Sequence, residues 1–184
     1  MNRMIVILAC LMCTVIASPQ SVEEPKFSEN FRSGVDAFVQ GKIEEAREHF
    51  SKEIQANNPQ CGHAYAFMSI LFGQSAEYAK NIEYANKAIS LLTEGKTLQT
   101  PEDTQSLSLA YTGRGHSYFM LGDSEKALED YSVAIRIMPD NPIAYRERSD
   151  VYNKMGEDSL SWVDMHQYLV LIGYPMEEES MTAE

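Results

Sequence analysis

The chain has 184 residues, of which 44% are hydrophobic and 23% are charged, and its formal net charge is −12 at pH 7. This length is enough for one compact domain or a short repeat array with a substantial apolar core, and the composition excludes a wholly disordered protein. Phosphate binding requires a basic surface, so the acidic balance argues against a nucleic-acid partner.

The first seventeen residues have the pattern of a secretory signal peptide. Arg3 supplies a basic start, and Met4 to Ala17 form an uncharged, largely apolar run. A membrane-spanning helix needs about 20 apolar residues, so this run is too short to be one. Cleavage after Ala17 predicts a mature chain that begins at Ser18 and is exported to a periplasm or secreted, whereas a cut after Ser18 would place Pro19 directly behind the scissile bond.

Cys10 offers a second interpretation of this segment, because residues 7–10 loosely resemble the lipid-attachment box of bacterial lipoproteins. A lipid anchor at Cys10 is therefore an alternative to simple cleavage, although the apolar run before it is short and continues beyond it. Cleavage would also remove Cys13 and leave Cys61 as the remaining cysteine. The mature chain would then form no internal disulfide and no metal site built on paired cysteines.

After a polar segment at 18–26, a repeated pattern organises the chain, and it is clearest between residues 111 and 139. Aromatic, small and turn-forming residues stand there at fixed offsets: Tyr111, Gly115, Tyr118, Gly122, Ala127, Tyr131 and Pro139. This stretch closely resembles the signature of the tetratricopeptide repeat family. The resemblance implies an all-α fold, a right-handed superhelical solenoid of helical hairpins in which stacked neighbours complete each other's core.

The same columns recur four times. The small residue of the first helix is found at Gly34, Ser69, Gly115 and Ser149, and the turn between the helices at Gly41, Ala76, Gly122 and Gly156. The spacings between successive columns are 35, 46 and 34 residues, against a family period of about 34. These positions predict a repeat domain at 27–172 with units at about 27–60, 62–95, 108–141 and 142–172. A tail at 173–184 follows, and its acidic composition predicts a solvated segment.

Twelve extra residues fall between the second and third units, at 92–106. Thr100, followed by Pro101 and two acidic residues, is typical of a helix start. The threonine is an N-cap, the proline stands in the first turn, and the helix dipole stabilises the two negative charges. The preceding helix is predicted to end near Glu94. One or both of the flanking helices should therefore exceed the family length and offer an edge to a partner, with a tolerated loop insertion as the alternative.

The last unit departs from the family pattern. Ser161, Met165 and Tyr168 replace its small-aromatic-small trio, and Trp162 stands beside them. A terminal repeat receives no following neighbour and can relax in this way, so we interpret the fourth unit as the cap of the array.

No catalytic constellation, cofactor motif or metal-ligand set is found in the sequence, which predicts a protein that is not an enzyme and binds no cofactor. The four histidines are isolated from one another: His49, His63, His116 and His166. Asp164 and His166 are two residues apart on a predicted helix and point to different faces. No nucleophile elbow, phosphate-binding glycine loop or paired-histidine zinc helix is present.

In tetratricopeptide repeat proteins the first helices of successive hairpins line a concave groove that binds extended peptides or partner helices. Transferring the groove-facing columns to this chain gives twelve candidate partner-binding residues. They are Phe31, Val35 and Phe38 in the first unit, His63, Ala66 and Ile70 in the second, Thr112, His116 and Phe119 in the third, and Arg146, Asp150 and Asn153 in the fourth. Such a groove grades from apolar to polar and suits an amphipathic segment.

The leader and the repeats together predict an exported adaptor that binds a protein or peptide. A structural, self-associating repeat domain and a non-catalytic regulator of an envelope enzyme or assembly pathway are the alternatives. The lysine and asparagine set with which some family members hold a peptide's terminal carboxylate is missing, so chaperone-tail binding is not predicted.

Overall fold

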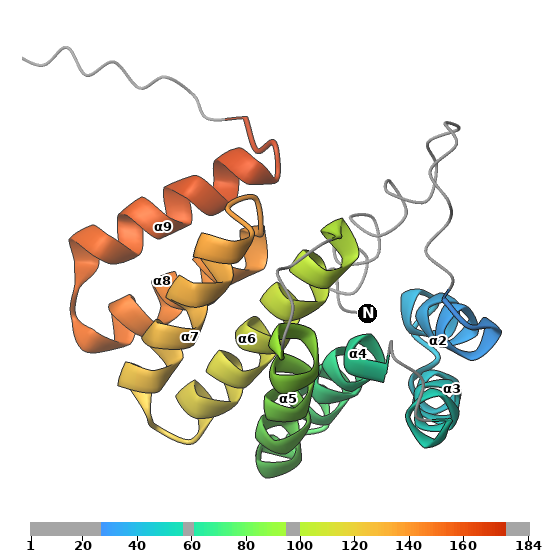
Figure 1. Ribbon diagram of the computed structural model, residues 1–184. Helices are drawn as coiled ribbons and strands as arrows, with labels where there is room; N and C mark the ends of the chain where they lie inside the picture. Colours follow the sequence, from blue (N-terminus) through green and yellow to red (C-terminus); the bar gives the residue numbers. More distant parts are fainter. Residues whose placement is uncertain (1–26, 57–60, 95–99, 176–184) are drawn as a thin grey trace, which may run out of the picture.

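The computed structural model describes residues 27–56, 61–94 and 100–175, and within these ranges it contains eight α-helices and no strand (Figure 1). The helices form four successive hairpins: α2 (Glu29–Val39) with α3 (Ile43–Gln55), α4 (Cys61–Gln74) with α5 (Tyr78–Thr93), α6 (Pro101–Met120) with α7 (Ser124–Ile137), and α8 (Pro142–Met155) with α9 (Asp158–Leu171). The predicted all-α solenoid is confirmed. The predicted signal peptide, the segment 18–26 and residues 176–184 of the tail lie outside the described residues.

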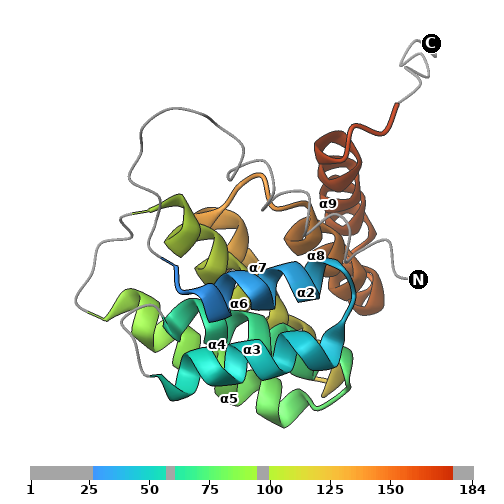
Figure 2. The same cartoon turned by 90° about the vertical axis from the view of Figure 1, so that its right-hand side faces the viewer.

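The hairpins stack in chain order, from α2 and α3 at one end to α8 and α9 at the other (Figure 1), and Figure 2 shows the array from the end that carries α2 and α3. The first helix of each later hairpin also packs on the second helix of the preceding one: α4 on α3, α6 on α5 and α8 on α7. First helices also pack directly on each other, α4 on α6 and α6 on α8. Second helices have less direct contact with one another. The first helices therefore line the inner side of the array.

Small residues let the two helices of a hairpin approach each other. A Cβ atom at Gly34 would lie 2.7 Å from Cε1 of Phe50, and one at Gly115 would lie 2.9 Å from Cε1 of Tyr131. Both distances are shorter than a normal carbon-carbon contact, so only glycine fits beside these buried rings. The small-residue column predicted from the sequence thus has a packing cause.

The predicted turn column is also confirmed, because Gly41, Gly122 and Gly156 all have positive φ angles between the two helices of a hairpin. Ala76 occupies the same column with φ of 58°, a left-handed conformation that disfavours a residue with a Cβ atom. The second hairpin therefore carries backbone strain that the glycine turns avoid.

Replacing Ala76 by glycine should raise the free energy of unfolding by about 0.5–1 kcal/mol, because relief of the left-handed strain exceeds the entropy that glycine loses on folding. Urea denaturation measures the change. Gly122→Ala is the matched control and should shift stability in the opposite direction, since its φ is 90°. If both substitutions raised the free energy of unfolding, or both lowered it, this account of the turns would be contradicted.

The helices that flank the insertion are both long, as predicted: α5 has 16 residues and α6 has 20, whereas the other helices have 11 to 14. The Thr100 side chain accepts a hydrogen bond from the backbone N–H of Asp103 at 3.1 Å, and Pro101 begins α6. The third hairpin accordingly starts at Pro101 and not near residue 108, because the inserted residues lengthen its first helix.

Candidate partner-binding surface

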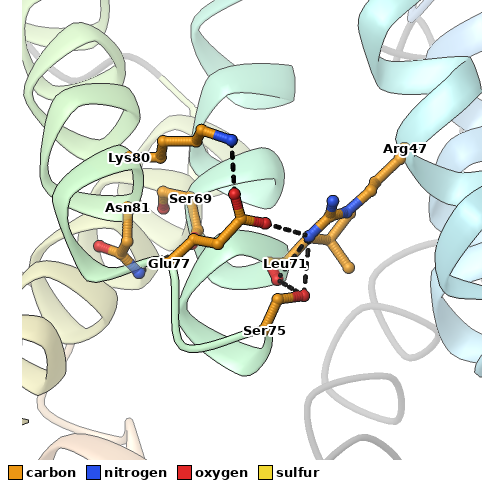
Figure 3. A network of polar contacts seen from close by, with 7 residues as sticks. All are labelled: Arg47, Ser69, Leu71, Ser75, Glu77, Lys80 and Asn81. Carbon is orange, nitrogen blue, oxygen red and sulfur yellow. Dashed lines mark hydrogen bonds and ion pairs between the residues drawn. The ribbon is translucent and has the colours of Figure 1, made fainter.

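A polar network closes the seam between the first two hairpins (Figure 3). Arg47 of α3 donates hydrogen bonds to the Ser75 hydroxyl at 2.8 Å and to the Leu71 carbonyl at 3.3 Å, and it forms an ion pair with Glu77 at 3.4 Å. Its guanidinium also lies over the Phe72 ring, 4.9 Å from the centroid. These contacts fix the end of α4 and the start of α5 to the preceding hairpin.

Asn81 in the same region occupies the column where the family has an alanine. Its side chain is buried, and its amide donates a 2.7 Å hydrogen bond to the Ser69 carbonyl. The neighbouring Gly73 leaves the space that this amide fills, since a Cβ atom there would lie 2.7 Å from the Asn81 nitrogen. The amide nitrogen of Asn81 is thus satisfied within the second hairpin, whereas its buried Oδ1 has no hydrogen-bond partner among the described residues.

Two equivalent arginine-aspartate clamps occur in the third and fourth hairpins, and each joins the two helices of its own hairpin. Arg114 forms two parallel hydrogen bonds to the carboxylate of Asp130, at 2.8 and 2.7 Å, and Arg148 does the same with Asp164, at 2.7 and 2.8 Å. Arg148 also donates to the Ser132 hydroxyl of α7 at 3.0 Å, so its clamp joins two hairpins. The hydrogen bond to Asp164 raises the pKa of Arg148.

We did not predict these clamps from the sequence, although a signal for them exists. The two arginines are separated by one repeat length of 34 residues, and so are the two aspartates. The recurrence of opposite charges one repeat length apart is the sequence signal for these four residues.

The inner surface between α6 and α8 centres on Glu147. Its carboxylate is buried and lies 2.9 Å from Nδ1 of His116, with Arg146 bonded to its other oxygen and the Tyr131 hydroxyl at 3.5 Å. Burial alone would raise the pKa of Glu147, but the bonds to His116 and Arg146 outweigh it and lower the pKa. Glu147 is therefore a charged anchor that fixes two neighbouring side chains.

The lowered pKa predicts how stability depends on pH. As the pH falls, the carboxyl of Glu147 takes up a proton near the ordinary pKa of 4.5 in the unfolded chain, but only at a lower pH in the folded chain. The stability that ionised Glu147 contributes to the folded state is therefore present above pH 4.5 and is lost as the pH falls through the folded pKa. The difference in unfolding free energy between wild type and Glu147→Gln should therefore shrink below pH 4.5. Urea titrations at several acidic pH values test this, with Glu83→Gln on the surface as control; a difference that grows on acidification would contradict it.

Around this anchor, side chains of mixed character remain accessible. Arg146 is half-buried, while Asp150 and Asn153 of α8 are exposed. Partial burial, followed by the nearby charge of Glu147, raises the pKa of Asp150. Phe119 of α6 is half-buried, with the Lys154 ammonium 4.7 Å from its ring centroid. The surface thus combines both signs of charge with an aromatic platform.

The structure divides the twelve predicted groove residues into two sets. The first set is buried: Phe31, Val35, Phe38, His63, Ala66 and Thr112. The second set is half-buried or exposed: Ile70, His116, Phe119, Arg146, Asp150 and Asn153. Most of the accessible set lies on the third and fourth hairpins.

In the first two hairpins the predicted groove columns pack inside the array. Phe31 and Phe38 of α2 both contact the Phe67 ring of α4, at centroid distances of 5.8 and 5.4 Å. This aromatic cluster contributes to the core, which is why residues that the family pattern assigns to an open groove are covered here. The apolar half of the expected groove is therefore not an open surface in this structure.

His63 is buried through the extension of α6. Its Nδ1 lies 2.8 Å from the Ser106 hydroxyl and its Nε2 lies 3.3 Å from the Asp103 carboxylate. A serine, histidine and aspartate in contact invite comparison with an acyl-transfer site, but Ser106 is buried within α6, where neighbouring backbone N–H groups are engaged in helical hydrogen bonds and cannot stabilise an oxyanion. The contacts serve to hold the start of α6 against α4.

Neither a metal site nor a membrane-spanning helix is found in the described ranges. No cluster of three or more histidine, cysteine, aspartate or glutamate side chains is placed there to hold a metal ion. The Cys61 thiol is free and buried. Over the same part of the chain, every helix is too short or too polar to span a bilayer.

Comparisons with known proteins agree with the fold. A family model described as "TPR repeat" matches residues 115–156. The "TPR repeat-containing protein MJ1428" of Methanocaldococcus jannaschii is 32% identical over 94 residues, which are 51% of this chain and 14% of that protein. The match thus spans a small part of the relative's length.

Two solved structures are also similar. One entitled "Crystal structure of MamA" has a TM-score of 0.58 at 20% identity and covers 90% of this chain and 86% of its own. Another, "MamA MSR-1 C2", has a TM-score of 0.53 at 14% identity, with coverage of 93% and 94%. At such identities the likeness concerns the fold alone. The chain thus matches a TPR repeat model at residues 115–156, within an array of four helical hairpins.

Proposed function

We propose that the protein is an exported, non-catalytic adaptor that binds an amphipathic segment of a partner protein on the inner surface of α6 and α8. The observation that carries the proposal is the set of accessible side chains around buried Glu147, which combines an aromatic platform with both signs of charge. Fold-level analogy adds that repeat arrays of this kind present their inner helices to partners.

The chemistry of this surface suits a segment with an apolar side and a mixed polar side. Arg146 and Asp150 lie one helical turn apart on α8, and Asn153 follows one turn later, so they form a row that can pair with both charges and backbone groups. Phe119 of α6, whose ring lies under the Lys154 ammonium of α8, offers apolar contact beside the row. The acidic chain supports a protein partner over nucleic acid.

The surface is also pre-organised. Glu147 bonds both Arg146 and His116, and the Arg148 clamp fixes the helix that carries the row. Side chains that are already ordered lose less conformational entropy when a partner binds, which strengthens binding without additional contacts.

Export rests on the leader-like first seventeen residues. The measurement is the intact mass of the protein recovered from its native cells, and cleavage after Ala17 gives a chain that starts at Ser18. A mass that includes the leader would contradict export by this route, and a lipid adduct on Cys10 would replace cleavage after Ala17 with anchoring.

The binding surface is tested by a paired substitution, Arg146→Ala with Asp150→Ala. Recovery of the partner on immobilised mature protein should weaken by about tenfold or more, since truncating central charged contacts commonly costs over 1 kcal/mol. Glu125→Ala with Glu129→Ala on the outer face of α7 is the matched control, because both side chains are exposed there. Equal recovery by all three proteins would contradict the proposed surface.

A further inference from the structure

The terminal helix α9 exposes an apolar face. It packs on α8, and its exposed apolar side chains include Leu160 (46% exposed), Trp162 (67%), Val163 (57%) and Val170 (49%). Between Ser159 and Ile172 no exposed residue of α9 is charged, and its carboxylate at Asp164 is buried in the clamp with Arg148. Exposed apolar side chains gathered on one face commonly mark an interaction site, whereas scattered single ones do not.

Comparison with α7, one repeat length earlier, shows that this face is not a general property of the repeat. The positions 34 residues before Leu160, Val163 and Val170 hold charged residues, each of them exposed: Lys126, Glu129 and Arg136. Three apolar residues thus stand at solvent-facing positions where α7 carries charges. Trp162 is in register with Leu128, which is half-buried and packs in the core cluster at the junction of the third and fourth hairpins.

The two ends of the array therefore differ. The outer side of α2 exposes charged residues, among them Arg32 and Asp36, as expected of a repeat that ends an array in solvent. The fourth hairpin, which we interpreted from the sequence as the cap, lacks such a polar surface on α9. Its face is typical of a helix that packs against another element.

We propose that α9 packs against α9 of a second copy of this chain, across a two-fold axis. Each copy carries a net charge of −12, so two copies repel each other over most of their surfaces, and the uncharged face of α9 is where they can approach without like charges in contact. Head-to-tail stacking would instead bury the exposed charges of Arg32 and Asp36 of α2 beneath the apolar face of α9, and such contacts form open filaments unless the rotation between copies closes a ring.

The residue order along α9 fits an antiparallel pair. A pairing centred on His166 places Trp162, one turn before the centre, opposite Val170 of the other copy, one turn after it. A large ring thereby meets a small side chain at both ends of the contact, the arrangement that lets helices interdigitate. A specific interface buries roughly 1,000 Å² or more in total, so the contact must run along most of the exposed face of α9.

The test uses the mature chain, its oligomeric state and its single tryptophan. Trp162 is that residue, so its fluorescence reports directly on this face. Sedimentation should show a dimer, and dilution should shift the emission to longer wavelength as Trp162 returns to water. The variant Val163→Glu with Val170→Arg, which restores the residue types of α7, should dimerise at least about a hundredfold more weakly, because it buries charges in the interface.

Lys126→Glu on α7 is the control and should remain a dimer, and helical circular dichroism verifies that every variant is folded. A monomeric wild type would overturn the proposal, as would a dimer that the α9 variant does not weaken or in which Trp162 stays in water. A monomer whose emission shifts only with phosphatidylcholine vesicles would likewise overturn it in favour of a membrane surface. The proposal concerns a face separate from the inner surface, so either can fail alone.

Discussion

Replacing Arg148 by alanine should lower the free energy of unfolding by about 3–5 kcal/mol, because the carboxylate of Asp164 would be left buried without its partner. The substitution also removes the bond to Ser132 and so weakens the junction with the third hairpin. Chemical denaturation followed by circular dichroism measures the loss.

A double-mutant cycle, built from Arg148→Met, Asp164→Leu and the two combined, separates the pair from the general cost of truncation. Arg148→Met combined with Asp164→Leu should recover most of the lost stability, since replacing both partners of a buried ion pair with apolar side chains is often neutral. Lys87→Ala, a truncation at an exposed position of α5, is the control and should change stability little. If Arg148→Ala cost no more than this control, the clamp would not stabilise the array.

Replacing Phe50 by alanine should cost about 3–5 kcal/mol, because this ring is fully buried and its removal leaves a cavity between the first two hairpins. Phe50 stacks on Phe67 with the ring centroids 5.0 Å apart and fills the space beside Gly34. Urea denaturation measures the stability, and hydrogen exchange should show that α2 and α3 lose more protection than α8 and α9, as repeats contact mainly their neighbours.

The exposed aromatic Tyr174 provides the control, and Tyr174→Ala should be close to neutral. A loss of less than 1 kcal/mol in Phe50→Ala, or loss of protection spread evenly over all four hairpins, would contradict the packing described for the first seam.

Much of the fold could be predicted from the sequence because local sterics impose the repeat pattern. Gly115 must be small where the Tyr131 ring fills the hairpin, and Gly122 must accept a positive φ. The caps are equally local: Asn141 accepts hydrogen bonds from the N–H groups of Ile143 and Ala144 at the start of α8, as its position before a proline suggests.

The accessible surface was harder to predict, because it depends on how hairpins pack on each other. His63 falls in a groove-facing column, yet the extension of α6 brings Asp103 and Ser106 beside it and buries it. The insertion was visible in the sequence, but not the direction in which the lengthened helix lies. The apolar residues of α9 were visible too, whereas their outward orientation follows only from the stacking.

The most direct test of the proposed function is site-specific photo-crosslinking in the native organism, with a photo-reactive residue at exposed Asn153 on the inner surface and, separately, at exposed Arg136 on the outer face of α7. The account predicts that mass spectrometry identifies the same partner segment from Asn153 repeatedly, and that Arg146→Ala with Asp150→Ala abolishes its capture. Capture of that segment from Arg136 alone, or equal capture from both positions, would contradict binding on the inner surface of α6 and α8.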